Sequence, residues 1–145
     1  MIMFNQNDSG DREEQLKYLN NKPEYQEDKL RLVPEQMKSF DFWNWSRIIE
    51  FKKRNCNYDT FPNWILEQYK YDTNMDIAQK HNILFFYQNK FDDGKIWEWN
   101  ITQMVKENLM PEPQIKEMNR HTFVNNPTKV PKKVYLLTLD MGYKI

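Results

Sequence analysis

The chain is poor in glycine, and this scarcity argues against several common kinds of binding site. It has three glycines in 145 residues, Gly10, Gly94 and Gly142, and none lies near another. A phosphate-binding loop needs glycines close together, because only then can several backbone N–H groups approach the anion. We therefore predict no nucleotide cofactor.

Cysteine and histidine are scarcer still. The single cysteine, Cys56, has no second thiol with which to form an internal disulfide. With His81 and His121 it makes only three soft or imidazole ligands, without CxxC or HExxH spacing, whereas structural zinc takes about four. An ordinary half-buried cysteine fits Cys56 better than a reactive thiol. We expect no metal and no other cofactor.

The carboxylates give no clear catalytic pair. Asp92, Asp93 and Glu98 form the one acidic group interleaved with aromatic residues. Acid–base catalysis needs carboxylates in a shared, buried site. A solvated turn followed by the polar face of a strand explains these three residues more simply. The sequence therefore predicts a protein that is not an enzyme.

The chain also lacks an excess of either charge and any long apolar run. Lys plus Arg and Asp plus Glu number 21 each, so no overall field attracts nucleic acid or anionic lipid. The longest apolar run, residues 83–87, is far shorter than the roughly 20 residues that span a bilayer. The first residues lack the apolar core of a secretory signal and soon turn acidic, unlike a transit peptide. We expect an intracellular chain, in the cytosol or in an organelle reached by an internal signal.

Aromatic residues are abundant for so polar a chain. They make up 15% of the residues, with five Trp, although the mean hydropathy is −0.95. Disordered chains contain few aromatic residues, so these rings belong to a core or to an interface. The densest block, residues 40–51, predicts a central helix over about 34–54, because its apolar residues fall on two adjacent helical stripes.

The rest of the chain predicts an α+β, mainly helical fold of three to five helices around that central helix. Asp93-Gly94 is typical of a hairpin turn, and alternating apolar residues on both sides predict a hairpin over 83–101. Continuous helices through this stretch are the alternative, since Trp97 and Ile101 also have helical spacing. Further helices are expected over 11–21, over about 60–71, over 74–82 and over 102–110.

The domain boundaries are predicted from composition. Residues 1–10 are expected to form a disordered tail, residues 11–110 a single domain, and residues 111–145 an extended, proline-punctuated arm. The arm ends in a predicted edge strand over 134–139, and it either folds back onto the domain or pairs with a neighbouring protein.

The absence of reacting groups and the excess of rings together predict a non-catalytic protein that binds other proteins, as an accessory or structural subunit of a larger assembly. The candidate partner-binding residues are Trp43, Trp45, Trp97, Trp99, Tyr135 and Leu137. A small stand-alone inhibitor of another protein is one alternative. Nucleic-acid binding through cations near aromatic residues is the other, with Lys52, Lys53, Arg54, Lys129, Lys132 and Lys133 as its candidates.

Overall fold

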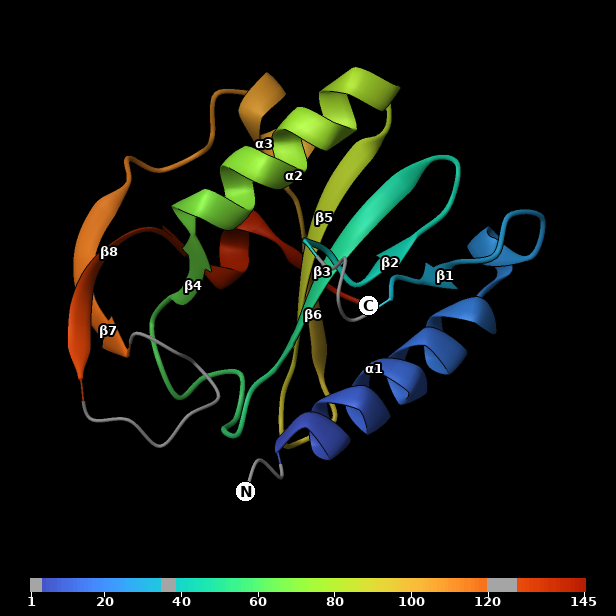
Figure 1. Cartoon of the computed structure of the whole chain (residues 1–145), viewed down its shortest axis with the longest axis horizontal. Helices are drawn as coiled ribbons and strands as arrows, with labels where there is room; N and C mark the ends of the chain where they lie inside the picture. The colour runs from blue at the N-terminus through green and yellow to red at the C-terminus, as the bar shows by residue number, and fades with distance from the viewer. Residues whose placement is uncertain (1–3, 35–38, 120–127) are drawn as a thin grey trace.

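A computed structural model describes residues 4–34, 39–119 and 128–145, and within these ranges the fold is mainly sheet, with 30% helix and 35% strand (Figure 1). The helices are α1 (Phe4–Asn20), α2 (Gln68–His81) and α3 (Ile101–Lys106), with short 3-10 turns at Pro23–Tyr25 and Leu139–Met141. The strands are β1 (Arg31–Leu32), β2 (Phe42–Trp43), β3 (Arg47–Lys53), β4 (Trp64–Glu67), β5 (Leu84–Lys90), β6 (Ile96–Asn100), β7 (Gln114–Asn119), β8 (Lys129–Leu137) and β9 (Tyr143–Lys144).

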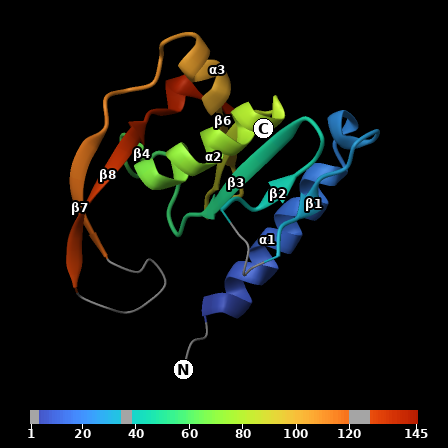
Figure 2. The same ribbon diagram turned by 45° about the horizontal axis from the view of Figure 1, so that its top comes forward.

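The strands form two sheets. Sheet A has six strands in the order β1-β2-β3-β5-β6-β9, and sheet B has three in the order β4-β8-β7. The only parallel pair among these strands is β3 with β5. The crossover between them runs through β4 and α2, so the connection that covers sheet A also contributes an edge strand to sheet B (Figures 1 and 2).

Helices α1 and α2 cover opposite faces of sheet A. Ile48 of β3 and Phe85 of β5 lie in one apolar cluster with Met75 of α2. The neighbouring residues Ile49 and Phe86 belong to a second cluster, with Leu19 of α1. Successive strand residues point to opposite faces, so β3 and β5 are buried on both sides.

The expected central helix over 34–54 is wrong, and with it the mainly helical fold. Its described part contains β2 and β3, while residues 35–38 lie outside the described ranges. A strand buried on both faces has a nearly continuous apolar run, which periodicity cannot distinguish from a buried helix. The adjacent β-branched residues Ile48 and Ile49 favour a strand, and that preference was the available signal.

The hairpin over 83–101 is confirmed by the antiparallel pairing of β5 with β6. Gly94 has a φ of +85° in the turn between them, a conformation that glycine adopts without a steric penalty.

The helices differ in extent from their predictions. Helix α1 begins at Phe4, before the expected start at Asp11, and α3 ends at Lys106. Of the residues expected as two helices over 60–82, 64–67 form β4 and 68–81 form the single helix α2.

The C-terminal segment folds back and completes both sheets. Strand β8, expected at an edge, lies in the middle of sheet B between β4 and β7. The chain then crosses to sheet A, where β9 pairs with β6. Two indoles hold this crossing in place, because Trp97 Nε1 donates to the Leu139 carbonyl and Trp99 Nε1 to the Thr138 carbonyl, each at 2.9 Å.

Gly142 lies against β6 where β9 begins. A Cβ atom at this position would lie 2.6 Å from the Glu98 carbonyl oxygen and 2.8 Å from Trp99 Cδ1. Gly142→Ala is therefore expected to lower the free energy of unfolding by about 1–3 kcal/mol, because backbone must move to admit the methyl group. Urea unfolding followed by tryptophan fluorescence measures this change. Gly10→Ala is the matched control.

Gly10 lies in α1, and apart from its chain neighbours and the backbone of its own helix no described atom comes within 4 Å of the place where an alanine methyl group would sit. Alanine there should leave stability unchanged or raise it by up to about 1 kcal/mol, because glycine is a poor helix former. Equal effects of the two substitutions would contradict the close packing of Gly142 on β6.

Candidate functional site

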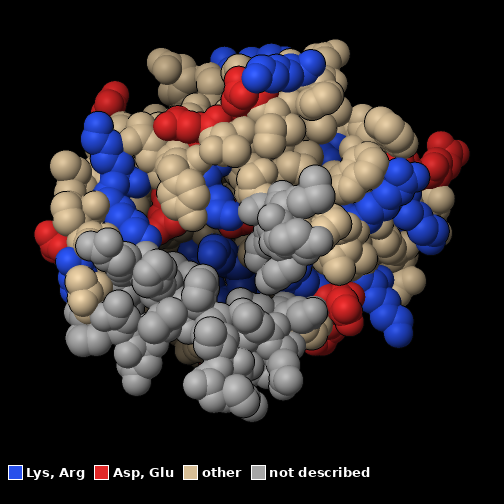
Figure 3. Space-filling view, in the orientation of Figure 1, with Lys and Arg blue, Asp and Glu red and all other residues tan. Residues whose placement is uncertain are grey.

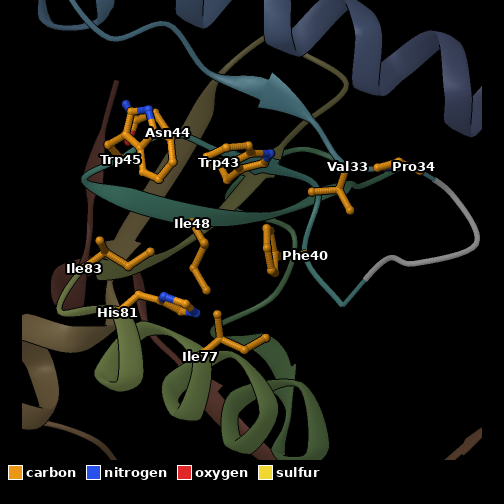
Figure 4. A pocket seen from close by; sticks show the side chains of 10 residues that line it. All are labelled: Val33, Pro34, Phe40, Trp43, Asn44, Trp45, Ile48, Ile77, His81 and Ile83. Atoms are coloured by element: carbon orange, nitrogen blue, oxygen red, sulfur yellow. The ribbon is translucent and has the colours of Figure 1, made fainter.

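A pocket of about 510 Å³ opens on sheet A beside α2. We call it the tryptophan pocket. Its lining residues are Val33, Pro34, Phe40, Trp43, Asn44, Trp45, Ile48, Ile77, His81 and Ile83. Figure 4 shows Ile77 and His81 pointing from α2 toward Phe40 and Ile48, with the two tryptophans on the strand side. The lining is mostly apolar, as in ligand and partner sites generally.

The pocket exists because α2 does not cover the whole face of sheet A. Trp43 lies directly across from Ile48 on one side and from Arg31 on the other, so all three side chains share a face. Ile48 belongs to the apolar cluster packed under α2, and Trp43 is only partly buried at its margin. The face of β1 and β2 therefore extends beyond the helix.

Trp45 stands at the mouth of this pocket with 71% of its surface exposed. Its ring meets Trp43 edge to face, with centroids 5.3 Å apart and an interplanar angle of 89°. The Arg31 guanidinium lies over both rings, 4.9 Å from the Trp43 centroid and 6.0 Å from that of Trp45. Among the described residues, the structure gives the Arg31 side chain no ion pair or hydrogen bond.

A hydrogen-bonded turn holds Trp45 in its exposed position. The buried side-chain oxygen of Asn44 accepts the backbone N–H groups of Ser46 and Arg47, each at 2.9 Å. The Asp28 carboxylate accepts the backbone N–H of Trp45 at 2.9 Å, and Asn44 donates to the Asp28 carbonyl. The backbone of Trp45 is thus held in place by polar contacts within this turn.

The other candidate partner-binding residues are buried or half-buried. Trp99, Tyr135 and Leu137 are buried in the cluster beneath α2. Trp97 is half-buried and stacks on Tyr58, with centroids 5.8 Å apart. Of the six candidates, the structure brings only Trp43 and Trp45 together at the surface.

The candidate nucleic-acid residues fall into two separate groups, several of whose members pair within the chain. Lys53 forms an ion pair with Asp92 at 2.9 Å, and Lys132 forms one with Glu67 at 3.0 Å. Arg54 donates to Asn89, to the Tyr87 hydroxyl and to the Ile65 carbonyl. Lys52 lies with Lys53 on β3, whereas Lys129 and Lys133 are exposed on β8. On the face in Figure 3, acidic side chains accompany the basic ones over β7 and β8.

The three acidic residues considered for catalysis do not share a site. Asp92 and Asp93 are exposed in the hairpin turn, whereas Glu98 is buried in β6. Glu98 accepts hydrogen bonds from Gln88 at 2.6 Å and from the Tyr143 hydroxyl at 2.7 Å, and so helps to hold β9. The described residues include no group of three His, Cys, Asp and Glu side chains placed to hold a metal. His121 lies outside them.

A second group of charged side chains is buried against sheet A, and no sequence pattern predicted it. Arg12 of α1 forms an ion pair with Asp41 at 2.8 Å, and Lys70 of α2 lies 3.5 Å from Glu50 of β3. Burial, and next the neighbouring Asp41 carboxyl, raise the pKa of Glu50 to about 8. Glu50 can therefore keep a proton near neutral pH. Neither Glu50 nor Asp41 lines the tryptophan pocket.

Of the lining residues, only Trp43 and Trp45 were candidates from the sequence. Sequence reasoning missed His81, which lines the pocket, and Arg31, which lies over the two tryptophan rings. Arg31 lies in a highly charged stretch and His81 at the end of α2, and no local pattern connects either with the tryptophans.

Within the described ranges, no helix combines the length and apolarity needed to cross a membrane. Comparisons with protein-family models, with curated proteins and with solved structures find no match to this chain, so the tryptophan pocket is interpreted from its own geometry.

Proposed function

We propose that this chain is a non-catalytic protein that binds another protein through the tryptophan pocket, as an accessory subunit of a larger assembly. The observation that carries the proposal is Trp45, 71% exposed beside an apolar pocket, with its backbone N–H bonded to the Asp28 carboxylate. Burying most of an indole would contribute on the order of 3–4 kcal/mol at about 25 cal/mol per Å². Tryptophan and arginine are also the residues most enriched where binding energy concentrates.

The C-terminal segment does not support this proposal. Its strands β7, β8 and β9 all pair within the chain, and β8 is paired on both sides. A stand-alone inhibitor would use the same kind of contact, and the identity of the captured protein separates the two cases.

Trp45→Ala should abolish capture of the partner while leaving the fold intact. The side chain contributes an edge contact with Trp43 and a cation–π contact with Arg31, and the hydrogen bond to Asp28 comes from its backbone. The measurement is affinity capture from the cells that make the protein, with quantitative identification of co-purifying chains. A polypeptide retained by the wild type should fall about 30-fold or more with Trp45→Ala.

Ile115→Ala is the matched control, because Ile115 is 66% exposed but lies on β7, outside the pocket. It should retain the same polypeptides as the wild type. Equal retention by all three proteins would refute the proposed site. Loss of every captured chain on nuclease treatment would favour the nucleic-acid alternative instead.

A further inference from the structure

The tryptophan pocket lies on a sheet face, and this position restricts what can fill it. A strand added to the free edge at β1 would lie in the plane of sheet A and would leave the pocket beneath it empty. A helix can instead lie on the face itself, beside α2. Ile77 and His81 are one helical turn apart on α2 and form one wall, while Trp43 and Ile48 form the floor.

The charges at the pocket indicate the polarity of the partner. Arg31 carries a guanidinium with no carboxylate partner among the described residues. Asp28, three residues before Arg31 in the chain, already accepts the Trp45 N–H with its carboxylate. Arginine binds carboxylates in a bidentate manner, and stacking on an aromatic ring restricts its motion before binding.

We propose that the pocket receives an amphipathic helix from the partner, with its apolar face against Trp43, Trp45 and Ile77 and an Asp or Glu side chain on Arg31. This inference rests on the proposed function, because it specifies the occupant of the same site. A helix there would continue the layer begun by α2 over the exposed part of sheet A. It would bury the Trp45 ring that the free chain leaves in water.

The test uses two displayed peptide libraries of about 16 residues, selected on the full chain. In the first library, a helix-promoting background carries one randomised face. The second has the same randomised positions interrupted by prolines, which prevents helix formation. The wild type should enrich binders from the helical library, with apolar residues at helical spacing and an acidic residue beside them.

Variants of the chain then test each contact on the selected peptides. Trp45→Ala should weaken binding about 30-fold or more, and Ile115→Ala should not change it. Arg31→Glu should weaken binding about tenfold or more. A peptide in which the selected acidic residue is replaced by lysine should bind Arg31→Glu better than it binds the wild type. This reversal identifies the charge pair, because a general loss of folding could not produce it.

The outcomes separate this inference from the proposed function. Binders that depend on Trp45 but come only from the proline-interrupted library would overturn the helix and leave the protein-binding site standing. Helical binders without an acidic residue, indifferent to Arg31→Glu, would overturn the charge pair. Binders indifferent to Trp45, or no binders from either library, would overturn both. Self-association of the wild type that Trp45→Ala abolishes would identify a second copy as the occupant instead.

Discussion

Deleting residues 111–145 is expected to abolish the cooperative unfolding transition of this chain. The deletion removes the central strand of sheet B together with β9. Val134 and Leu137 are fully buried, and their loss also uncovers Trp64 and Trp99. Removing one large buried side chain costs about 2–5 kcal/mol, whereas whole domains are stable by only about 5–15 kcal/mol. Several such losses together exceed the stability available.

Circular dichroism during heating, together with the dispersion of amide signals in an NMR spectrum, measures the outcome. A point substitution gives a graded version of the same test. Leu137→Ala should cost about 2–5 kcal/mol, because Leu137 is buried beneath α2. Leu136→Ala is the matched control, since Leu136 is adjacent on β8 but only half-buried on the other face. A truncated chain that still unfolds cooperatively at an unchanged temperature would show that the C-terminal segment is dispensable.

Glu50→Gln is expected to stabilise the chain near pH 8 and to flatten its dependence on pH. Burial and the Asp41 carboxyl raise the pKa of Glu50 from 4.5 to about 8 in the folded chain. Between these two values the folded chain keeps a proton that the unfolded chain releases, so the contribution of Glu50 to stability falls as the pH rises. It is fully present below about pH 4.5 and is lost by about pH 8.

The charged groups around Glu50 act on its pKa in opposite directions. Lys70 lies 3.5 Å away, and it and Lys52 favour the ionised form, whereas Asp41 opposes it. Each pKa unit corresponds to about 1.4 kcal/mol, so over the roughly three units from pH 5 to pH 8 we expect Glu50→Gln to gain up to about 4 kcal/mol over wild type. Urea unfolding at several pH values measures the difference between the two proteins.

Asp76→Asn serves as the control for this experiment, since Asp76 is an exposed carboxylate that pairs with Lys80 on the surface of α2. Its stability should follow the wild-type pH profile. If the curves of Glu50→Gln and wild type stayed parallel from pH 5 to pH 8, Glu50 would be ionised in the folded chain and its pairing with Lys70 would dominate.

How much of the fold could be predicted depended on whether each strand has a solvent-facing side. The β5–β6 hairpin was predictable because Asp93-Gly94 marks its turn and its residues alternate. Strand β3 was not, because both of its faces are buried and its apolar run fits a helix equally well. The position of β8 inside sheet B depends on pairing with β4, more than 60 residues earlier, and no local pattern encodes that pairing.

The site was predictable only in part, for a related physical reason. Trp43 and Trp45 were candidates because they are large rings in a polar chain, although they were placed on a helix that does not form. The same reasoning selected Trp99 and Leu137, because composition does not distinguish an interface from a core. His81 joins the pocket, and Arg31 reaches the two tryptophan rings, only through the tertiary fold.

The position of β8 and β9 also bears on how the chain is made. A ribosome releases residues 129–144 after every strand with which they pair. Until then β4 has no partner within sheet B, and the outer edge of β6 is unpaired. Until residues 129–144 emerge, the nascent chain therefore has two incomplete sheets, the state in which exposed strand edges are most open to wrong pairing and to chaperones.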